Sequence, residues 1–214
     1  KCIHTPISSL PQQLPHTLTF LEISQTLISA LPQLPDSLTV LSFSRTSIRS
    51  DLPQQLPHSL KHLNCSTSHL SALPHTLPEH LAYLSCSNTD ISALPQQLPQ
   101  AMTYLNCSNT HISALPEPLP HTLTYLNCGG CIHLHMLPQL PQTLTHLVVS
   151  DNSLTLQKLP ESLTTLICDS TYISTLPLLP PSLTHLNVSL THIRSLPPLP
   201  DSLHSLACNR SPLQ

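Results

Sequence analysis

The stretch AMTYLNCSNTHISALP (residues 101–116) decides the fold, because it recurs with small changes along the chain. The preceding copy reads HLAYLSCSNTDISALP (80–95), and the following copy reads TLTYLNCGGCIHLHMLP (122–138). Units cut before each phased Leu-Pro pair start at Leu10, Leu31, Leu52, Leu73, Leu94, Leu115, Leu137, Leu159, Leu176 and Leu196. Successive starts lie 21 residues apart five times, and then 22, 22, 17 and 20. A period of this length indicates a solenoid, in which stacked units bury a shared core.

The composition narrows the classes of protein that this chain can belong to. With 24 Pro, long helices are excluded, and with 8% charged and 3% aromatic residues leucine must supply most of the core. A formal net charge of -3, with seven Lys and Arg, gives no basic surface for nucleic acid. No apolar run approaches the length that crosses a membrane.

Each unit contains the pattern L-x-x-L-x-(C/V/I/F), whose alternation is typical of a short strand. We expect these strands to pair in parallel, so that the fold is a solenoid. Its curved parallel β-sheet would form the concave face, and extended or polyproline turns would form the convex face. The second leucine of the strand is leucine in every unit, as expected for one interior column: Leu21, Leu41, Leu63, Leu84, Leu105, Leu126, Leu147, Leu166, Leu186 and Leu206.

The repeats also suggest how the chain is organised. Residues 10–195 are expected to form nine leucine-rich repeats, and 196–214 a last partial repeat or a C-terminal cap. The start, KCIHTPISS, lacks the apolar core of a signal peptide. We interpret residues 1–9 as the end of a missing N-terminal region or as a cap.

These repeats resemble leucine-rich repeats, and the doubled LPxxLP step is similar to that of bacterial secreted effectors of the YopM and IpaH type. LPPSLTHLNVS (179–189) is more weakly similar to FNIP repeats. The resemblance implies a non-enzymatic module, without cofactors, that binds a host protein after secretion by a bacterium into the host cytoplasm. The alternative it leaves open is the substrate-recognition arm of an IpaH-like E3 ubiquitin ligase. The C-x-D catalytic motif of such ligases is not identified, because Cys168 of CDS occupies a repeat position.

One position, two residues after the strand leucine, holds cysteine in six units: Cys65, Cys86, Cys107, Cys128, Cys168 and Cys208. The other units have Ile23, Phe43, Val149 and Val188 there. A position exchanged between cysteine and plain hydrophobic residues indicates core packing, with cysteine as a small apolar residue. Thiols stacked in register point the same way, which is poor geometry for a disulfide, so we expect reduced cysteines and a reducing compartment.

Three residues further on, most units have threonine where leucine-rich repeats have asparagine. We expect these hydroxyl groups to satisfy backbone groups in the turn, and not to act as nucleophiles. The exception is CGGCIHLH (128–135), in which Cys128, Cys131, His133 and His135 form a plausible zinc set in isolation. Because both cysteines already have repeat positions, we interpret the segment as a bulged turn, with a zinc- or thiol-dependent enzyme as the alternative.

If the strand leucines point inward, the residues on either side of them point outward. The column before the leucine contains Phe20, His62, Tyr83, Tyr104, Tyr125, His146 and His185, and the column after it contains Asn64, Asn106, Asn127 and Asn187. Tyrosine is enriched at the centres of protein interfaces. These residues are therefore the predicted partner-binding surface on the concave face, although the strand propensity of tyrosine alone could explain the stripe.

Overall fold

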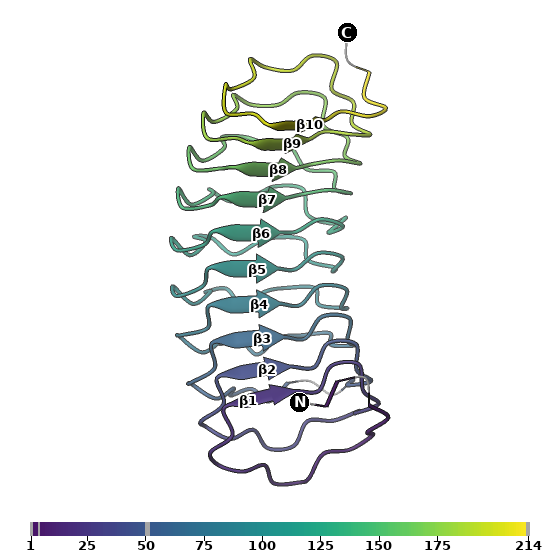
Figure 1. The fold of residues 1–214 in the computed structure, drawn as a ribbon, viewed down its shortest axis with the longest axis vertical. Coiled ribbons are helices and arrows are strands. Elements are labelled where there is room, and N and C mark those ends of the chain that lie inside the picture. Colours follow the sequence, from purple (N-terminus) through teal and green to yellow (C-terminus); the bar gives the residue numbers. More distant parts are fainter. Residues whose placement is uncertain (1, 4, 50–51, 213–214) are drawn as a thin grey trace.

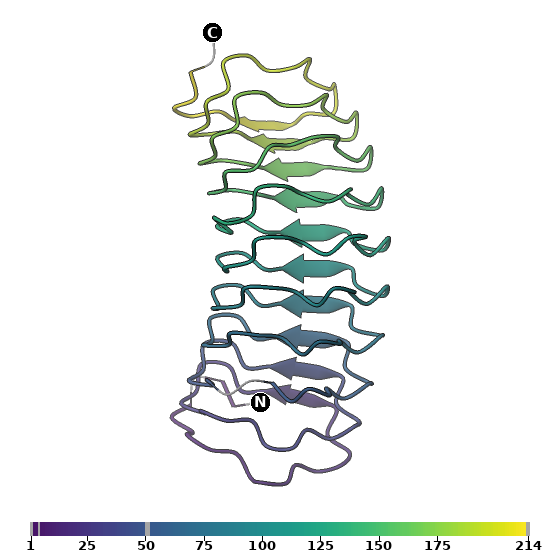
Figure 2. The same cartoon turned by 180° about the vertical axis from the view of Figure 1, so that it is seen from behind.

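The computed structural model describes residues 2–3, 5–49 and 52–212 of the chain. Within this part it has ten short strands and no helix. The strands are β1 Phe20–Glu22, β2 Val40–Ser42, β3 His62–Asn64, β4 Tyr83–Ser85, β5 Tyr104–Asn106, β6 Tyr125–Asn127, β7 His146–Val148, β8 Thr165–Ile167, β9 His185–Asn187 and β10 Ser205–Ala207. They form one parallel sheet in sequence order, and the chain returns behind the sheet after each strand (Figures 1 and 2). The predicted solenoid is confirmed.

The register of the sheet places the invariant leucines opposite one another. Leu84 of β4 pairs with Leu105 of β5, which in turn pairs with Leu126 of β6. All three side chains are fully buried. At the end of the sheet, Leu206 of β10 has a neighbouring strand on one side only and is 39% exposed. A leucine inside the stack is thus covered by the turns on both sides of it, whereas Leu206 is not.

The cysteine column lies inside the stack, as predicted. Cys65, Cys86, Cys107, Cys128 and Cys168 are fully buried, Cys208 is partly buried, and all of them are unpaired. Some thiols also donate a weak hydrogen bond to the next turn, as Cys65 Sγ does to the carbonyl oxygen of Ser85 at 3.4 Å. The same carbonyl oxygen accepts the N–H of Cys65 at 2.9 Å. Burial raises the pKa of the Cys65 and Cys168 thiols to about 12, so both remain neutral.

The threonine column satisfies backbone groups in the turn. Thr110 Oγ1 donates to the carbonyl oxygen of Cys107, three residues earlier, at 2.7 Å. Thr26, Thr46, Ser68, Thr89, Thr171 and Thr191 make the same bond. Asn152 differs, since its Nδ2 reaches the carbonyl oxygen of Cys128 in the preceding turn at 2.9 Å. The framework role predicted for the hydroxyl groups matches this geometry.

A second set of hydroxyl groups joins successive turns just before the strands begin. Thr122 Oγ1 donates to the carbonyl oxygens of Gln100 and Met102, at 2.7 and 2.8 Å. The same two-carbonyl arrangement recurs at Ser37, Ser59, Thr143, Ser162, Ser182 and Ser202. These bonds supply polar contacts between turns in a chain that has few charges.

The repeat structure also includes residues that precede β1 in the sequence. Cys2 N donates to the carbonyl oxygen of Glu22 at 2.9 Å, and Thr5 Oγ1 donates to the carbonyl oxygen of Cys2 at 3.3 Å. Leu27 N donates to the carbonyl oxygen of Ile7 at 3.0 Å. These are the bonds that the second half of a repeat makes elsewhere in the stack. Residues 2–3 and 5–9 therefore lie against the first complete turn as further repeat structure.

One residue in each turn has a left-handed backbone. The φ values lie between 53° and 71° at Gln25, Arg45, Thr67, Asn88, Asn109, Gly130, Asp151, Ser170, Leu190 and Arg210. Each such residue follows the cysteine column by two positions. Apart from Arg210 in the last turn, each donates its N–H to the next turn, as Thr67 N does to the carbonyl oxygen of Ser87 at 2.8 Å. Glycine, asparagine and aspartate tolerate this conformation, whereas a β-branched residue such as Thr67 is strained in it.

We expect Cys107→Asp to destabilise the protein by more than about 3 kcal/mol, because it would bury an unpaired charge. Cys107→Val should cost less than about 1.5 kcal/mol, since the change conserves volume approximately and valine occupies this column at Val149 and Val188. Urea unfolding measures both values. Similar losses for the two variants would contradict the core position of the thiol.

Thr67→Asn should stabilise the fold by about 1 kcal/mol, because asparagine tolerates a left-handed backbone better than threonine does. Its side chain would also extend the pair in which Asn109 Nδ2 donates to Asn88 Oδ1 at 3.2 Å. Thermal unfolding of the variant and of wild type gives the comparison. A lower melting temperature for the variant would show that the turn does not hold residue 67 in this conformation.

Candidate protein-binding face

The candidate site is the outward surface of the sheet, which we call the sheet face. It comprises the first and third residues of the strands β1–β10. Tyr83, Tyr104 and Tyr125 begin the adjacent strands β4, β5 and β6, and the register places them directly opposite one another. All three are half-buried. The parallel register therefore brings the predicted tyrosine stripe together.

The tyrosine rings form a continuous stack with a histidine at each end. Tyr83 and Tyr104 have ring centroids 4.2 Å apart, and those of Tyr104 and Tyr125 are 4.3 Å apart, with interplanar angles of 8° and 7°. His62 stacks on Tyr83 at 3.9 Å. His146 is tilted by 31° against Tyr125, with centroids 6.0 Å apart. Because the ring faces cover one another, this ring stack presents ring edges and hydroxyl groups to a partner.

Two predicted members of the first column lie outside the ring stack. Phe20 is on β1, separated from His62 by Val40 of β2. His185 is on β9, separated from His146 by Thr165 of β8. Both remain on the sheet face, where Phe20 is 38% exposed. The structure thus concentrates the aromatic surface on β3–β7.

Burial disfavours the charged forms of His62, Tyr104 and Tyr125 in the ring stack. It raises the pKa of Tyr104 and Tyr125 above the usual value, and neighbouring phenols add to the rise. The amides of Asn106 and Asn127 oppose it, as N–H donors beside a phenol oxygen do. Burial also lowers the pKa of His62, against the raising effect of Glu22. These three side chains are therefore uncharged at neutral pH and capable of hydrogen bonding.

The asparagines of the second column have a definite orientation. Asn106 Oδ1 accepts the N–H of Ser108 at 3.1 Å, and Asn127 Oδ1 accepts that of Gly129 at 3.0 Å. Asn64 and Asn187 accept from Ser66 and Ser189 in the same way, each at 3.1 Å. Since a backbone N–H can only donate, the amide oxygen must face the turn. The N–H groups of each amide are then the part that faces the sheet surface.

Val148 and Ile167 lie in the outward column that the repeat predicts, but they were not among the predicted partner-binding residues. They are the third residues of β7 and β8, they pair in register, and both are half-buried. Asn127 and Asn187 flank this pair on the neighbouring strands. Aliphatic side chains in an otherwise polar column form an apolar step on the sheet face. The signal in the sequence was that aliphatic residues replace asparagine at these two positions of the column.

The CGGCIHLH segment does not assemble a zinc site. Cys128 and Cys131 are fully buried, whereas His133 and His135 are exposed. Cys131 takes the place of threonine, with its Sγ 3.1 Å from the carbonyl oxygen of Cys107 and 3.4 Å from Thr110 Oγ1. No group of three or more His, Cys, Asp or Glu side chains in the described part of the chain could hold a metal ion. The bulged-turn interpretation agrees with this geometry.

The two thiols that meet inside this turn affect one another. Their hydrogen bond lowers the pKa of Cys131 to about 6 and raises the pKa of Cys107. The Cys131 sulfur nevertheless has no exposed surface. A nucleophile must be reachable by its substrate, so this pair has no access for thiol chemistry in the folded chain.

Comparison with known proteins relates this architecture to bacterial effectors. No protein-family model and no curated protein sequence matches the chain. The solved structure of YopM from Yersinia enterocolitica is 36% identical over 100% of this chain and 46% of its own, with a TM-score of 0.93. YopM from Yersinia pestis is 33% identical over 96% of this chain and 58% of its own, with a TM-score of 0.83. This chain thus spans about half the length of each YopM chain that it matches.

A Shigella effector leucine-rich-repeat domain is also similar. It is 28% identical over 72% of this chain and 69% of its own, with a TM-score of 0.59. In the part of the chain that the structure describes, no helix is long and apolar enough to cross a membrane. This chain is therefore a leucine-rich-repeat solenoid that resembles those of YopM and the Shigella effector domain.

Proposed function

We propose that this chain is a protein-recognition module that binds a partner protein on its sheet face. The observation that carries the proposal is the half-buried ring stack on β3–β7, at the centre of a broad outward surface. Tyrosine supplies a large contact area with little loss of side-chain entropy, and stacking has already fixed these rings. A partner would therefore meet a rigid surface.

The similarity to YopM and to the Shigella domain supports a more specific proposal. The chain would be the repeat region of a secreted bacterial effector, and its partner would be a host protein. The unpaired cysteines agree with work in the reducing host cytoplasm, where thiols persist. The inward thiols would then serve the fold, while the outward columns select the partner.

The likeness to the Shigella effector domain also favours a second candidate. In that case the chain would be the substrate-recognition arm of an IpaH-like ubiquitin ligase, and catalysis would belong to a separate domain of the full-length protein. Both candidates assign the same role to the sheet face. Ubiquitin transfer by the full-length protein, assayed with and without this chain, distinguishes them.

The variant Tyr83→Thr/Tyr104→Thr/Tyr125→Thr should lose the partner, because it removes the central rings. Threonine is accommodated in this column at Thr165, so the strand should form. In affinity capture from a human cell lysate, we expect wild type to retain a protein that the triple variant does not. For that protein, isothermal titration should show affinity reduced at least about 10-fold.

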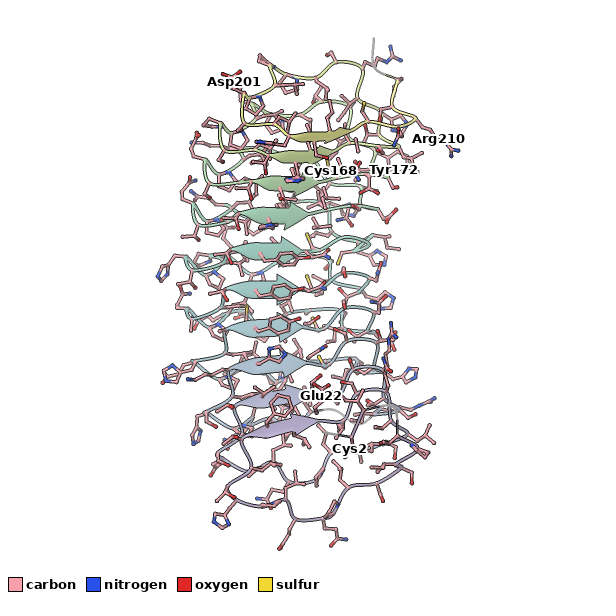
Figure 3. The ribbon with its side chains drawn as sticks, viewed as in Figure 1. Cys2, Glu22, Cys168, Tyr172, Asp201 and Arg210 are labelled. Atoms are coloured by element: carbon pink, nitrogen blue, oxygen red, sulfur yellow. The ribbon has the colours of Figure 1, made fainter. Side chains whose placement is uncertain are left out.

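The matched control is Tyr172→Thr. This tyrosine is 75% exposed and projects from the turn after β8, beyond the carboxyl ends of the strands (Figure 3). It also stacks on a histidine, His192, at 5.4 Å. The control should bind as wild type does. Equal capture by wild type, the triple variant and the control would remove the ring stack from the proposed function.

A further inference from the structure

We infer that the sheet face recognises an extended, acidic segment of its partner. The carboxylates of this segment would lie along the asparagine column, and an aliphatic side chain of the segment would contact Val148 and Ile167. This inference rests on the proposed function and specifies the chemistry of the partner. It follows from the orientation of the amides, from the distribution of charge and from the apolar step. All three features belong to residues that the structure describes.

The asparagine column presents hydrogen-bond donors to a partner, because its amide oxygens face the turns. In Asn64, Asn106, Asn127 and Asn187, Oδ1 is occupied by a turn N–H, at 3.0 to 3.1 Å. An Nδ2 group has no acceptor capacity, so each amide can only donate outward. The complementary group on a partner is an acceptor, and hydrogen bonds to a charged acceptor are the stronger ones.

Few acids at the sheet face would repel such a partner. Asp169, two residues after β8, accepts a hydrogen bond from Ser150 Oγ at 2.7 Å. Among the described residues of the two outward columns, Glu22 of β1 is the only acid, and its Oε1 already accepts a hydrogen bond from Ser24 at 2.7 Å. Lys61 lies immediately before β3 and is exposed. The first column holds no acid. Together with the donors of the asparagine column and the positive charge of Lys61, this favours a partner that supplies anionic acceptors.

Length and shape indicate an extended segment. Asn64 is on β3 and Asn187 on β9, and a strand spacing of about 4.8 Å places them about 29 Å apart. An extended peptide of about nine residues covers that distance. The ring faces are covered by one another at 3.9 to 4.3 Å, which excludes a partner that binds by stacking on an open ring.

The apolar step fixes where an aliphatic side chain of the partner would lie. Val148 and Ile167 pair on adjacent strands, and each is flanked by an asparagine on its other side. Burying aliphatic surface here removes both side chains from water without leaving an amide unpaired. The step thus supplies an apolar contact between the donors of Asn127 and Asn187.

The test uses fluorescence anisotropy with labelled peptides of about twelve residues, long enough to span the column. One peptide alternates Glu and Ser around a central Leu, and its counterpart has Lys in place of each Glu. We expect the acidic peptide to bind at least 10-fold more tightly than the basic one, and its affinity to fall with rising salt. No binding at up to about 1 mM, or equal binding of both peptides, would overturn the inference.

The decisive variant is Asn106→Asp/Asn127→Asp. Aspartate keeps an oxygen for the N–H groups of Ser108 and Gly129, so the turns should fold, but it replaces the outward donors with a repelling carboxylate. Affinity for the acidic peptide should fall at least 10-fold. The control Asn88→Asp/Asn209→Asp makes the same charge change at exposed positions in the turns after β4 and β10, and should change affinity less than 3-fold. Equal losses in both variants would contradict a local effect.

The apolar step has its own test. Val148→Asn/Ile167→Asn introduces the residue that β9 carries in this column, Asn187. This variant should bind the leucine peptide and a serine-substituted version equally, whereas wild type should prefer leucine. A retained preference would place the aliphatic contact elsewhere. If acidic peptides fail while the triple tyrosine variant still loses a captured protein, the proposed function stands and only this inference falls.

Discussion

The structure depends on one inward column of leucines, repeated in register through ten parallel strands. A single turn has three strand residues and cannot enclose its own leucines. Stacking solves this, because the leucines inside the stack are buried by the turns on both sides. The adjacent column accepts cysteine, valine, isoleucine or phenylalanine, since its requirement is an apolar side chain of suitable size.

Much of this core could be predicted from the sequence, because periodicity reports which residues point inward. The leucine column, the buried cysteines and the framework role of the threonines follow from position in the repeat alone. The left-handed backbone of one residue in each turn could not be predicted in this way. The residues that adopt it share no chemical type, as Gln25, Thr67, Gly130 and Leu190 show. A backbone requirement imposed by the stack overrides local preference there.

The surface was predictable in composition but not in geometry. Repeat position identified Tyr83, Tyr104 and Tyr125 as outward neighbours. The stacking of their rings depends on the separation of the strands and on side-chain rotamers, and the repeat pattern predicts neither. The amide oxygens of Asn106 and Asn127 face the turn because each accepts an N–H from the residue two positions later. Such contacts determine what a partner can meet, so the chemistry of the face required coordinates.

The most direct test of the continuous core is the reactivity of the eight cysteines toward a water-soluble disulfide reagent. In the folded protein, we expect rapid reaction only at the partly buried Cys2 and Cys208, because the other six sulfurs are fully buried. All eight should react after unfolding in denaturant. Rapid reaction of the core cysteines in the folded protein would contradict a shared interior that runs through successive turns.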